Sequence, residues 1–298
     1  MHHIFNTNFE WELEKDLNVD LEHSFSKIHK KFLSLGNLFA KSGDTVFPEK
    51  PLAGQIINSW APSRLIQEYA KKHNLLYSIP PWETIKKIAS KEFAHTLSPL
   101  PNSRILHTLE ELNEWLKKVP EPYVFKSFYG FSGTGHKFRS TNLTFPVLAE
   151  PWVTRSFDFS SQWEIKNGQM NYLGATILRS NERGAYKETL AARNEVQLFG
   201  SNYHYLQEQI AFIKSHTHSF SPFFGNLGID AFVYNNTLQP ICEVNARKTF
   251  GYLALHLLTK HPEKTSFTLS FDKEKGLTFE GQTCKVASGH FKLATLQV

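Results

Sequence analysis

The segment from Gly228 to Arg247 constrains the fold more than any other part of this chain. It contains two runs in which apolar and polar residues alternate, and the turn-forming residues Asn235-Asn236-Thr237 separate them. Alternation with a period of two predicts extended strands with one apolar face, and asparagine favours turns. The segment therefore predicts a β-hairpin.

This hairpin is predicted to bring two carboxylates together. If residues 236 and 237 form the centre of the loop, Asp230 lies opposite Glu243, with Asn245 one step along. Like charges directly opposite each other destabilise a sheet, and a divalent cation offsets this repulsion most simply. Two carboxylates and an amide oxygen suit Mg²⁺, and Arg247 adds a phosphate-binding fork at the same edge. Two alternatives stay open: the side chains decorate a solvent face, or a register shifted by two loosens the pairing.

The composition is typical of a folded protein that binds anions. The chain has 298 residues, of which 41% are hydrophobic and 20% charged, and a formal net charge of +5. The apolar content excludes a disordered chain, and the positive excess suits nucleotides or nucleic acid. Basic doublets such as Lys30-Lys31 are dispersed, which solvated helix faces also explain. Two cysteines fit a reducing cytoplasm, and we expect neither a secretory signal nor a membrane span.

A second candidate site follows a strand predicted over residues 123–126. Lys126 ends this strand, and a loop with glycines at 130, 133 and 135 comes next. Such a loop can place backbone N–H groups against phosphate oxygens while a nearby lysine supplies charge. The loop is not a Walker A loop, which needs Gly-Lys-Ser/Thr, and it lacks the helix that follows a dinucleotide fingerprint. Ordinary turns also contain such glycines, so this signal is weak without the carboxylate hairpin.

The remaining patterns alternate strands and helices without a regular βαβ repeat, so the predicted fold class is α+β. Asn167-Gly168 predicts a tight hairpin turn, and Thr108 with Glu111 predicts a helix capping box. Periodicity predicts a strand over 147–150, helices over 22–35, 63–70, 84–95, 108–118, 203–213 and 250–258, and hairpins over 162–179, 228–246 and 266–280.

The order of these features resembles the ATP-grasp superfamily, which includes D-alanine–D-alanine ligase and other carboxylate–amine ligases. The residues that carry the resemblance lie between positions 85 and 255: Lys126, the glycine loop, Glu150-Pro151-Trp152-Val153, Asp230 and Glu243-x-Asn245-x-Arg247. The resemblance implies an ATP-grasp fold, in which two α+β subdomains clasp ATP and Mg²⁺.

The resemblance also implies a set of site residues. Those that contact the phosphates, the adenine edge or the ribose of ATP are Lys91, Lys126, Gly130, Ser132, Gly133, Gly135, Glu150, Trp152, Val153 and Asp158. The implied magnesium ligands are Asp230, Glu243 and Asn245. Arg247 and Arg179 are the candidate catalytic residues, which would steady the transferred phosphoryl group. For Arg179 the alternative is a solvated side chain at the end of a strand.

Enzymes of this superfamily generally phosphorylate a substrate carboxylate, and an amine then attacks the acyl phosphate. The resemblance therefore implies a cytoplasmic ligase that joins a small-molecule carboxylate to an amine and releases ADP and phosphate. The alternatives are an ATP-grasp kinase that phosphorylates a hydroxyl and a non-catalytic protein that binds nucleotide or nucleic acid. No RNA-binding aromatic motif or helix-turn-helix pattern supports nucleic acid as the partner.

The first part of the chain departs from the superfamily pattern. Residues 1–80 show no parallel-strand pattern, so we expect residues 1–88 to be a reduced or divergent, largely helical region. Residues 89–298 form the predicted ATP-grasp domain, with a small lid subdomain over 104–150 and a large one over 151–298. Strand parity predicts that Cys242 faces away from Glu243 as a core thiol. His136 either touches a phosphate or is a solvated loop residue.

Overall fold

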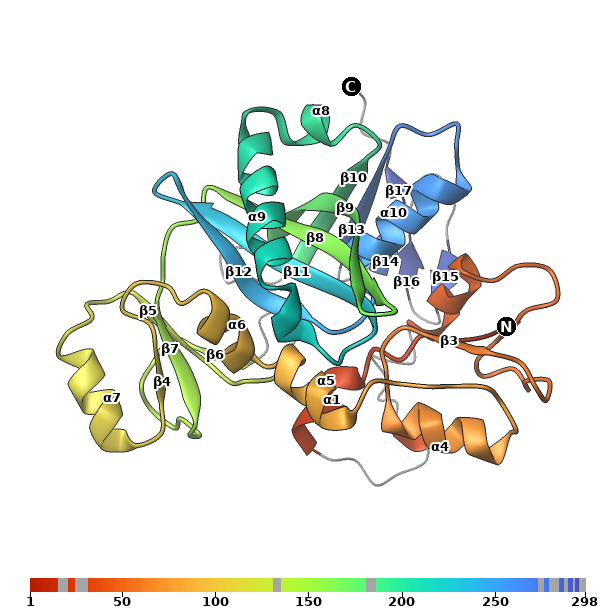
Figure 1. The fold of residues 1–298 in the computed structure, drawn as a ribbon, viewed down its shortest axis with the longest axis horizontal. Coiled ribbons are helices and arrows are strands. Elements are labelled where there is room, and N and C mark those ends of the chain that lie inside the picture. Colours follow the sequence, from red (N-terminus) through yellow and green to blue (C-terminus); the bar gives the residue numbers. More distant parts are fainter. Residues whose placement is uncertain are drawn as a thin grey trace.

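The computed structural model describes residues 1–15, 21–24, 32–130, 135–180 and 186–272, and four further strand segments up to residue 294. These residues form an N-terminal region, a four-stranded sheet and an eight-stranded sheet (Figure 1). We call the two sheets the small sheet and the large sheet. The mixture of helices and strands confirms the predicted α+β class.

The N-terminal region is built on three very short parallel strands. β1 (His2–Ile4) lies between β2 (Thr45–Val46) and β3 (Ile57–Ser59). The helical segments around them are α1 (Phe9–Lys15), α2 (Leu21–Ser24), η1 (Leu33–Leu38) and α4 (Arg64–Lys72). The sequence analysis misses this sheet because strands of two or three residues are too short to show alternation. The single helix predicted over 22–35 is wrong at its end, because a separate 3-10 helix begins at Leu33. Residues 25–31 lie outside the described ranges.

Two helices lead from the N-terminal region to the small sheet. α5 (Trp82–Ala89) and α6 (Lys91–Leu97) replace the single helix predicted over 84–95. The break is at Ser90, whose backbone is extended and whose hydroxyl accepts a hydrogen bond from the Phe93 N–H at 3.1 Å. Serine is a preferred N-cap, and here it begins a second helix within an apolar pattern. As a result, Lys91 stands at the first position of α6.

The small sheet has the strand order β4-β7-β5-β6, and its neighbouring strands are antiparallel. Its strands are β4 (Arg104–Leu106), β5 (Tyr123–Lys126), β6 (His136–Lys137) and β7 (Val147–Pro151). Trp115 of α7 (Leu109–Leu116) packs against Phe125 in a separate hydrophobic core. The predicted cap at Thr108 is confirmed, because its hydroxyl accepts a hydrogen bond from the Glu111 N–H at 3.2 Å. The Glu111 carboxylate accepts from the His107 N–H at 2.6 Å rather than from the Thr108 N–H of a regular capping box.

The large sheet runs in the order β12-β11-β8-β9-β10-β13-β14, with β17 beside β13, and all these pairs are antiparallel. Its strands are β8 (Phe157–Lys166), β9 (Gln169–Ser180), β10 (Tyr186–Ala192), β11 (Gly225–Tyr234), β12 (Thr237–Asn245), β13 (Ser266–Asp272), β14 (Gly276–Thr278) and β17 (Leu293–Ala294). β15 (Cys284–Val286) and β16 (Gly289–Phe291) pair separately. The predicted turn at Asn167-Gly168 is confirmed, since both residues have the positive φ angles of a tight hairpin, 52° and 74°.

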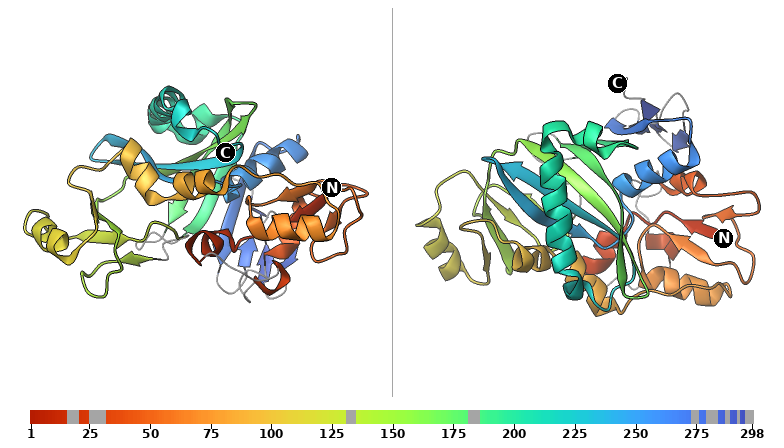
Figure 2. Two further views of the ribbon diagram at one scale, coloured as in Figure 1. Left: turned by 60° about the horizontal axis from the view of Figure 1, so that its bottom comes forward. Right: turned by 45° about the horizontal axis from the view of Figure 1, so that its top comes forward.

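The two faces of the large sheet have different covers. The helical segments that follow β10 and β12 are α8 (Glu195–Phe199), η2 (Gly200–Asn202), α9 (Tyr203–Ser215), η3 (Thr217–Phe220) and α10 (Phe250–Lys260). α8 and α9 lie over one face, where Phe159 and Leu206 are buried (Figure 2). α10 begins on the opposite face, because a Cβ at Gly251 would come within 2.6 Å of Gln162 Nε2. The face under α10 carries the candidate site.

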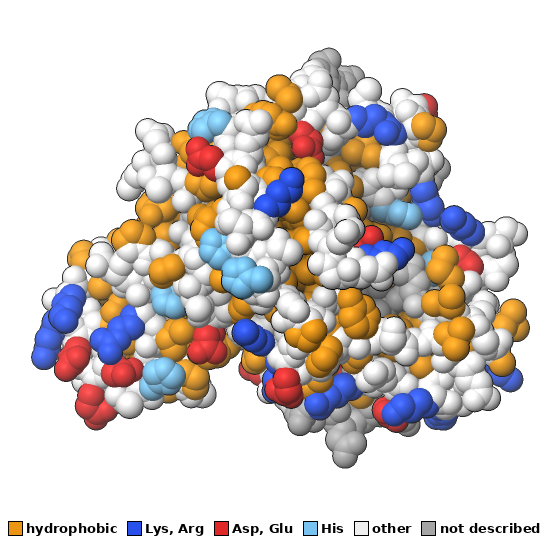
Figure 3. Space-filling view, viewed as in Figure 1, with side chains coloured by type: hydrophobic (Ala, Val, Ile, Leu, Met, Phe, Trp, Pro, Cys, Tyr) orange, Lys and Arg blue, Asp and Glu red, His pale blue; other side chains and the backbone are white. Residues whose placement is uncertain are grey.

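One hydrophobic core joins the N-terminal region to the large sheet. The rings of Phe5 and Trp60 stack with centroids 4.1 Å apart, in the same buried cluster as Trp163 of β8 and Phe267 of β13. The space-filling view shows the outline indented between the small sheet and the N-terminal helices (Figure 3). Within the described ranges, no helix combines the length and the hydropathy needed to span a bilayer.

Candidate functional site

The β11–β12 hairpin brings together the two carboxylates that the sequence predicts to meet. In the observed register Asp230 lies opposite Glu243, and Gly228 lies opposite Asn245. Asn245 Nδ2 donates a hydrogen bond to Asp230 Oδ2 at 3.2 Å. Because opposed residues of a sheet share a face, the three polar side chains form one half-buried, oxygen-rich group. We call Asp230, Glu243 and Asn245 the carboxylate cluster.

The register of this hairpin arises differently from the prediction. The turn consists of residues 235 and 236, both Asn with positive φ angles of 46° and 55°, rather than residues 236 and 237. That turn alone would place Ile241 opposite Asp230. A bulge between Asp230 and Phe232 shifts the register by two residues and restores the pairing with Glu243. The predicted loop centre is wrong, and the predicted pairing is right because of the bulge.

Lys91 balances part of the charge in the carboxylate cluster. Its Nζ donates to Glu243 Oε1 at 2.7 Å, and only 8% of the Lys91 side chain is exposed. Burial by itself raises the pKa of Glu243, but the charge and hydrogen bond of Lys91 lead the effects that outweigh it and lower this pKa. Burial and the charge of Glu243 raise the pKa of Asp230 to about 7. The sequence argument is therefore incomplete, because a lysine already offsets part of the repulsion between the two carboxylates.

A row of buried polar side chains extends the cluster across the large sheet. Ser160 lies opposite Asp230, and Thr176 lies opposite Ser160. Gln162 donates to Ser160 Oγ at 2.8 Å and accepts a hydrogen bond from Thr249 Oγ1 at 2.7 Å. Ser160, Gln162 and Thr176 are at most 2% exposed. These satisfied hydrogen bonds make a fixed polar floor beside Asp230.

The small sheet contributes a second group of charges. Lys126, at the end of β5, forms a buried ion pair with Glu150 of β7. His136 of β6 lies opposite Lys126 in the strand register. Burial, followed by Lys126 and Lys91, lowers the pKa of His136 to about 4, while Glu243 acts to raise it. The end of the small sheet therefore lies close enough to Lys91 and Glu243 for their charges to act on His136.

The glycine loop connects β5 to β6. Its residues 131–134, which include the predicted Ser132 and Gly133, lie outside the described residues. Gly135 has a φ of +86°, and a Cβ there would collide with Ser127 Oγ, so both the conformation and the space require glycine. Gly130 also has a positive φ, 156°. The loop ends at His136, whose Nδ1 is buried with no hydrogen-bond partner among the described residues, so this histidine is not a solvated loop residue.

Residues 152–156 connect the small sheet to the large sheet at the predicted hinge. The Trp152 N–H donates to the Pro122 carbonyl at 2.8 Å, so this group is not available to a nucleotide base. Val153 follows and is half-buried. The Glu150 carboxylate, predicted at the adenine edge, is bound to Lys126 instead of being free.

Two residues beside the hinge were not predicted from the sequence, Arg155 and Phe232. Arg155 Nη1 donates to Asp158 Oδ1 at 2.9 Å, and its guanidinium lies 4.0 Å from the centre of the buried Phe232 ring. The predicted ribose-binding Asp158 is thus paired with an arginine. Strand parity could have indicated Phe232, which follows Asp230 by two residues on the same face. No sequence pattern marks Arg155.

The two predicted catalytic arginines have different surroundings. Arg247 lies near the carboxylate cluster, where its charge acts to lower the pKa of both carboxylates. Arg179 lies on the opposite face of β9 from Thr176, and therefore on the opposite face of the sheet from the cluster. Its side chain is 61% exposed and contacts Glu188 at 3.4 Å. The prediction that Arg179 belongs to the site is wrong, and the solvated alternative is correct.

Cys242 lies in the bulge of β12, so strand parity does not hold at this position. Burial raises the pKa of its thiol to about 12, and Arg155, Lys126 and Glu243 are among the charges that act on it. Cys242 is half-buried and borders the candidate site, so the prediction of a core thiol that faces away from Glu243 is not confirmed.

Solved structures similar to this chain identify its fold. A protein from Archaeoglobus fulgidus, assigned to the ATP-grasp superfamily, has a TM-score of 0.58 at 11% identity and covers 99% of each chain. N5-carboxyaminoimidazole synthetase from Staphylococcus aureus, complexed with ADP, has a TM-score of 0.55 at 11% identity over 92% of this chain and 82% of that chain. Biotin carboxylase from Campylobacter jejuni, in a β-γ-ATP complex, has a TM-score of 0.54 at 14% identity over 74% of this chain and 60% of that chain. The chain has the ATP-grasp fold, as the resemblance predicts.

Sequence comparison gives no relative that would extend this conclusion. No protein-family model matches the chain, and no curated protein matches it. The chain spans 60% of the length of the biotin carboxylase, and identities of 11–14% show the fold alone. The activity must therefore be argued from the site.

Proposed function

We propose that this protein is an ATP- and Mg²⁺-dependent ligase that activates a small-molecule carboxylate as an acyl phosphate for attack by an amine. The observation that carries the proposal is the contact of Lys91 with the carboxylate cluster, beside a small-sheet histidine on which Lys91, Lys126 and Glu243 all act electrostatically. Lysines and carboxylates in this arrangement suit a Mg²⁺–polyphosphate ligand, because phosphoryl transfer depends on positioning and charge neutralisation. The fold supports a nucleotide ligand, since similar structures contain ADP and β-γ-ATP.

We assign magnesium to Asp230, Glu243 and Asn245. Their oxygens are hard ligands of the kind that Mg²⁺ prefers, and burial together with the neighbouring charge of Glu243 raises the pKa of Asp230, a cost that a bound cation would offset. A bound Mg²⁺ would neutralise charge on the phosphates. The chain itself orients Asp230 through the hydrogen bond from Asn245 and keeps Glu243 ionised through Lys91.

We assign the nucleotide to the space between the two sheets. The proposed phosphate contacts are Lys91, Lys126, Gly130, Ser132, Gly133 and Gly135. Val153 offers the hinge N–H to the base, because the N–H of Trp152 is already bound to Pro122. Glu150 and Asp158 are the proposed contacts of the adenine edge and the ribose. In this structure Glu150 is paired with Lys126, and Asp158 is paired with Arg155. Both ion pairs would have to break before these carboxylates contact a nucleotide.

In the proposed reaction a substrate carboxylate oxygen attacks the γ-phosphorus of ATP, and the bond to the β,γ-bridging oxygen breaks to release ADP. The amine nitrogen then attacks the acyl carbon, loses a proton, and expels phosphate with the electron pair of the C–O bond. Arg247 would hold the transferred phosphoryl group, where a cationic fork stabilises the charge of the transition state.

A screen for ADP release tests this proposal, with pairs of amino acids and small peptides in the presence and absence of Mg²⁺. Hydroxylamine should trap the acyl phosphate as a hydroxamate, whereas a stable phosphoester would indicate a kinase. Glu243→Gln should abolish the Mg²⁺-dependent release, and Glu14→Gln, at an exposed position of α1, should not. Absence of Mg–ATP binding by the wild-type protein would refute the proposal.

The organisation of the chain is proposed on the same basis. Residues 89–298 are the proposed ATP-grasp domain, with a lid over 104–150 and a large subdomain over 151–298, and residues 1–88 are a separate N-terminal part. A cytoplasmic location is also proposed. Basic and acidic side chains are interspersed on the face shown in Figure 3, which favours a small anionic ligand over nucleic acid.

A further inference from the structure

Arg247 is joined to the N-terminal region by an ion pair. Its Nε donates to Glu10 Oε1 at 2.6 Å, across 237 residues of sequence. The two side chains are only 15% and 11% exposed. Glu10 lies on α1, so an element outside the hairpin and outside both sheets contacts an arginine whose charge acts on the carboxylate cluster.

The contacts of Arg247 with described residues leave one edge of its guanidinium without a hydrogen-bond partner. Arginine has five N–H donors in a planar fork. Nε is bound to Glu10, and Nη1 donates to the Lys248 carbonyl at 3.1 Å. No described residue accepts a hydrogen bond from Nη2. Because Arg247 acts on the pKa of both carboxylates of the cluster, its charge lies close to the place proposed for the phosphates.

A comparison within α1 shows that, among the described residues, Arg247 is the partner of Glu10. Glu12, two residues further on, accepts hydrogen bonds from the Ser63 hydroxyl at 2.6 Å and from the Arg64 and Leu65 N–H groups at 2.7 and 3.2 Å. Glu12 thereby anchors the start of α4. Among the described residues, the hydrogen bond that Glu10 accepts comes from Arg247.

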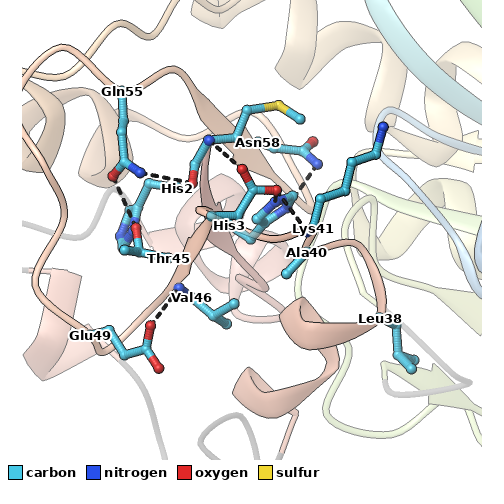
Figure 4. Close-up of polar contacts among 12 residues, drawn as sticks. His2, His3, Leu38, Ala40, Lys41, Thr45, Val46, Glu49, Gln55 and Asn58 are labelled. Atoms are coloured by element: carbon cyan, nitrogen blue, oxygen red, sulfur yellow. Dashed lines mark hydrogen bonds and ion pairs between the residues drawn. The ribbon is translucent and has the colours of Figure 1, made fainter.

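The N-terminal region is also held in place next to Arg247 without Glu10. The Lys248 N–H donates to the Trp60 carbonyl at 3.0 Å, and Lys248 Nζ donates to the Ser59 carbonyl at 2.6 Å and to Asn58 Oδ1. Figure 4 shows Asn58 beside His3 of β1, to which it is hydrogen-bonded at 3.0 Å. Attachment of the region thus does not depend on the Glu10–Arg247 pair.

We propose that Glu10 is a positioning residue, which fixes the Arg247 guanidinium so that its free edge faces the phosphoryl group during transfer. The inference rests on the proposed function, in which Arg247 holds that group. Without Glu10, Arg247 keeps its contact with the Lys248 carbonyl but loses the bond that sets the plane of the fork. Misplacement of a transition-state contact by about 1 Å can cost about 100-fold in rate.

The test compares Glu10→Ala, Glu10→Gln, Arg247→Ala and the double variant Glu10→Ala/Arg247→Ala, with Glu14→Ala on the same helix as the matched control. Glu10→Ala should lower kcat for Mg–ATP-dependent ADP release by about tenfold or more and change KM for ATP by less than about twofold. Glu10→Gln should restore most of the activity, because its amide oxygen still accepts from Nε. The double variant should be no slower than Arg247→Ala, because Glu10 acts through Arg247.

A binding measurement makes the same test without turnover. Calorimetry with Mg–ADP and with the non-hydrolysable Mg–AMPPNP gives the ratio of the two Kd values, which reports contacts to the γ-phosphate. Glu10→Ala should shift this ratio toward that of Arg247→Ala, and Glu14→Ala should leave it at the wild-type value. If Glu10→Ala does not fold, as judged by circular dichroism, Glu10→Asp replaces it and should show the same shift.

The possible failures are distinguishable. Wild-type protein that binds neither Mg–ADP nor Mg–AMPPNP overturns the proposed function, and this inference with it. Wild-type protein that binds both, together with a Glu10→Ala variant that matches Glu14→Ala, overturns the inference alone. Multiplicative losses in the double variant would overturn it as well, because Glu10 would then act independently of Arg247.

Discussion

Replacement of Asp230 by asparagine should stabilise the protein above pH 7 while it removes a proposed magnesium ligand. Asp230 lies opposite Glu243, and burial together with this neighbour raises its pKa from 3.8 to about 7. Asparagine has nearly the same shape and keeps an oxygen that can accept the hydrogen bond from Asn245 Nδ2. The variant therefore removes an electrostatic cost without opening a cavity.

The sign of the effect follows from proton linkage. From about pH 4 to about pH 7, folded wild-type protein holds a proton on Asp230 that the unfolded chain has released. The contribution of this group to the free energy of unfolding therefore falls as the pH rises through that range, and it is constant above it. The whole difference corresponds to about 4 kcal/mol, of which about 3 kcal/mol is lost between pH 5 and pH 8. The asparagine variant has no such dependence.

Urea denaturation of both proteins between pH 5 and pH 8, in metal-free buffer, measures this difference. The stability of Asp230→Asn relative to wild type should increase by about 3 kcal/mol over that range, and the exposed control Glu14→Gln should show no comparable trend. Added Mg²⁺ should stabilise the wild type by mass action and should stabilise the variant less, because the variant lacks one of the two carboxylate charges. A variant less stable than wild type at pH 8, or a gain independent of pH, would refute the reasoning.

Three further predictions concern other parts of the chain. Glu12→Ala should lower the free energy of unfolding by about 2 kcal/mol, because a hydroxyl and two N–H groups at the start of α4 lose their acceptor. Urea denaturation of this variant and of the control Glu14→Ala measures the loss, and equal stabilities of the two variants would contradict the prediction. Lys126→Met should cost about 3 kcal/mol, because Glu150 stays buried without its partner. Thermal denaturation should show that Glu150→Leu restores most of this loss in the double variant. Arg179→Ala should leave ADP release and Mg–ATP affinity within about twofold of wild type, because this exposed side chain lies on the other face of the sheet; a larger loss would return Arg179 to the site.

Local patterns predicted much of the fold, because they act between neighbours along the chain. Asn167 and Gly168 tolerate positive φ angles and therefore form the same turn that the sequence predicts. Thr108 caps α7 for an equally local reason. The break at Ser90 was not predicted, since a serine within an apolar pattern is compatible with either one helix or two.

The site was predictable only in part for a related reason. Alternation predicts which face of β11 carries Asp230, and this agrees with the structure. The partner of each charged side chain could not be predicted in this way. Lys91 binds Glu243 across 152 residues, and Arg155 pairs with Asp158 from a loop without a repeating pattern. Periodicity carries no information on such contacts.

By itself, the sequence determined the longer strands, the turn at Asn167-Gly168, the cap of α7 and the face on which Asp230 stands, because each of these depends on a few adjacent residues. Only the tertiary structure decided the bulge that aligns Asp230 with Glu243, the face that excludes Arg179, and the pairing of Arg247 with Glu10. The physical reason is that burial and charge at one position are supplied by elements distant in the chain. These elements meet only when the hydrophobic core has brought the N-terminal region onto the large sheet.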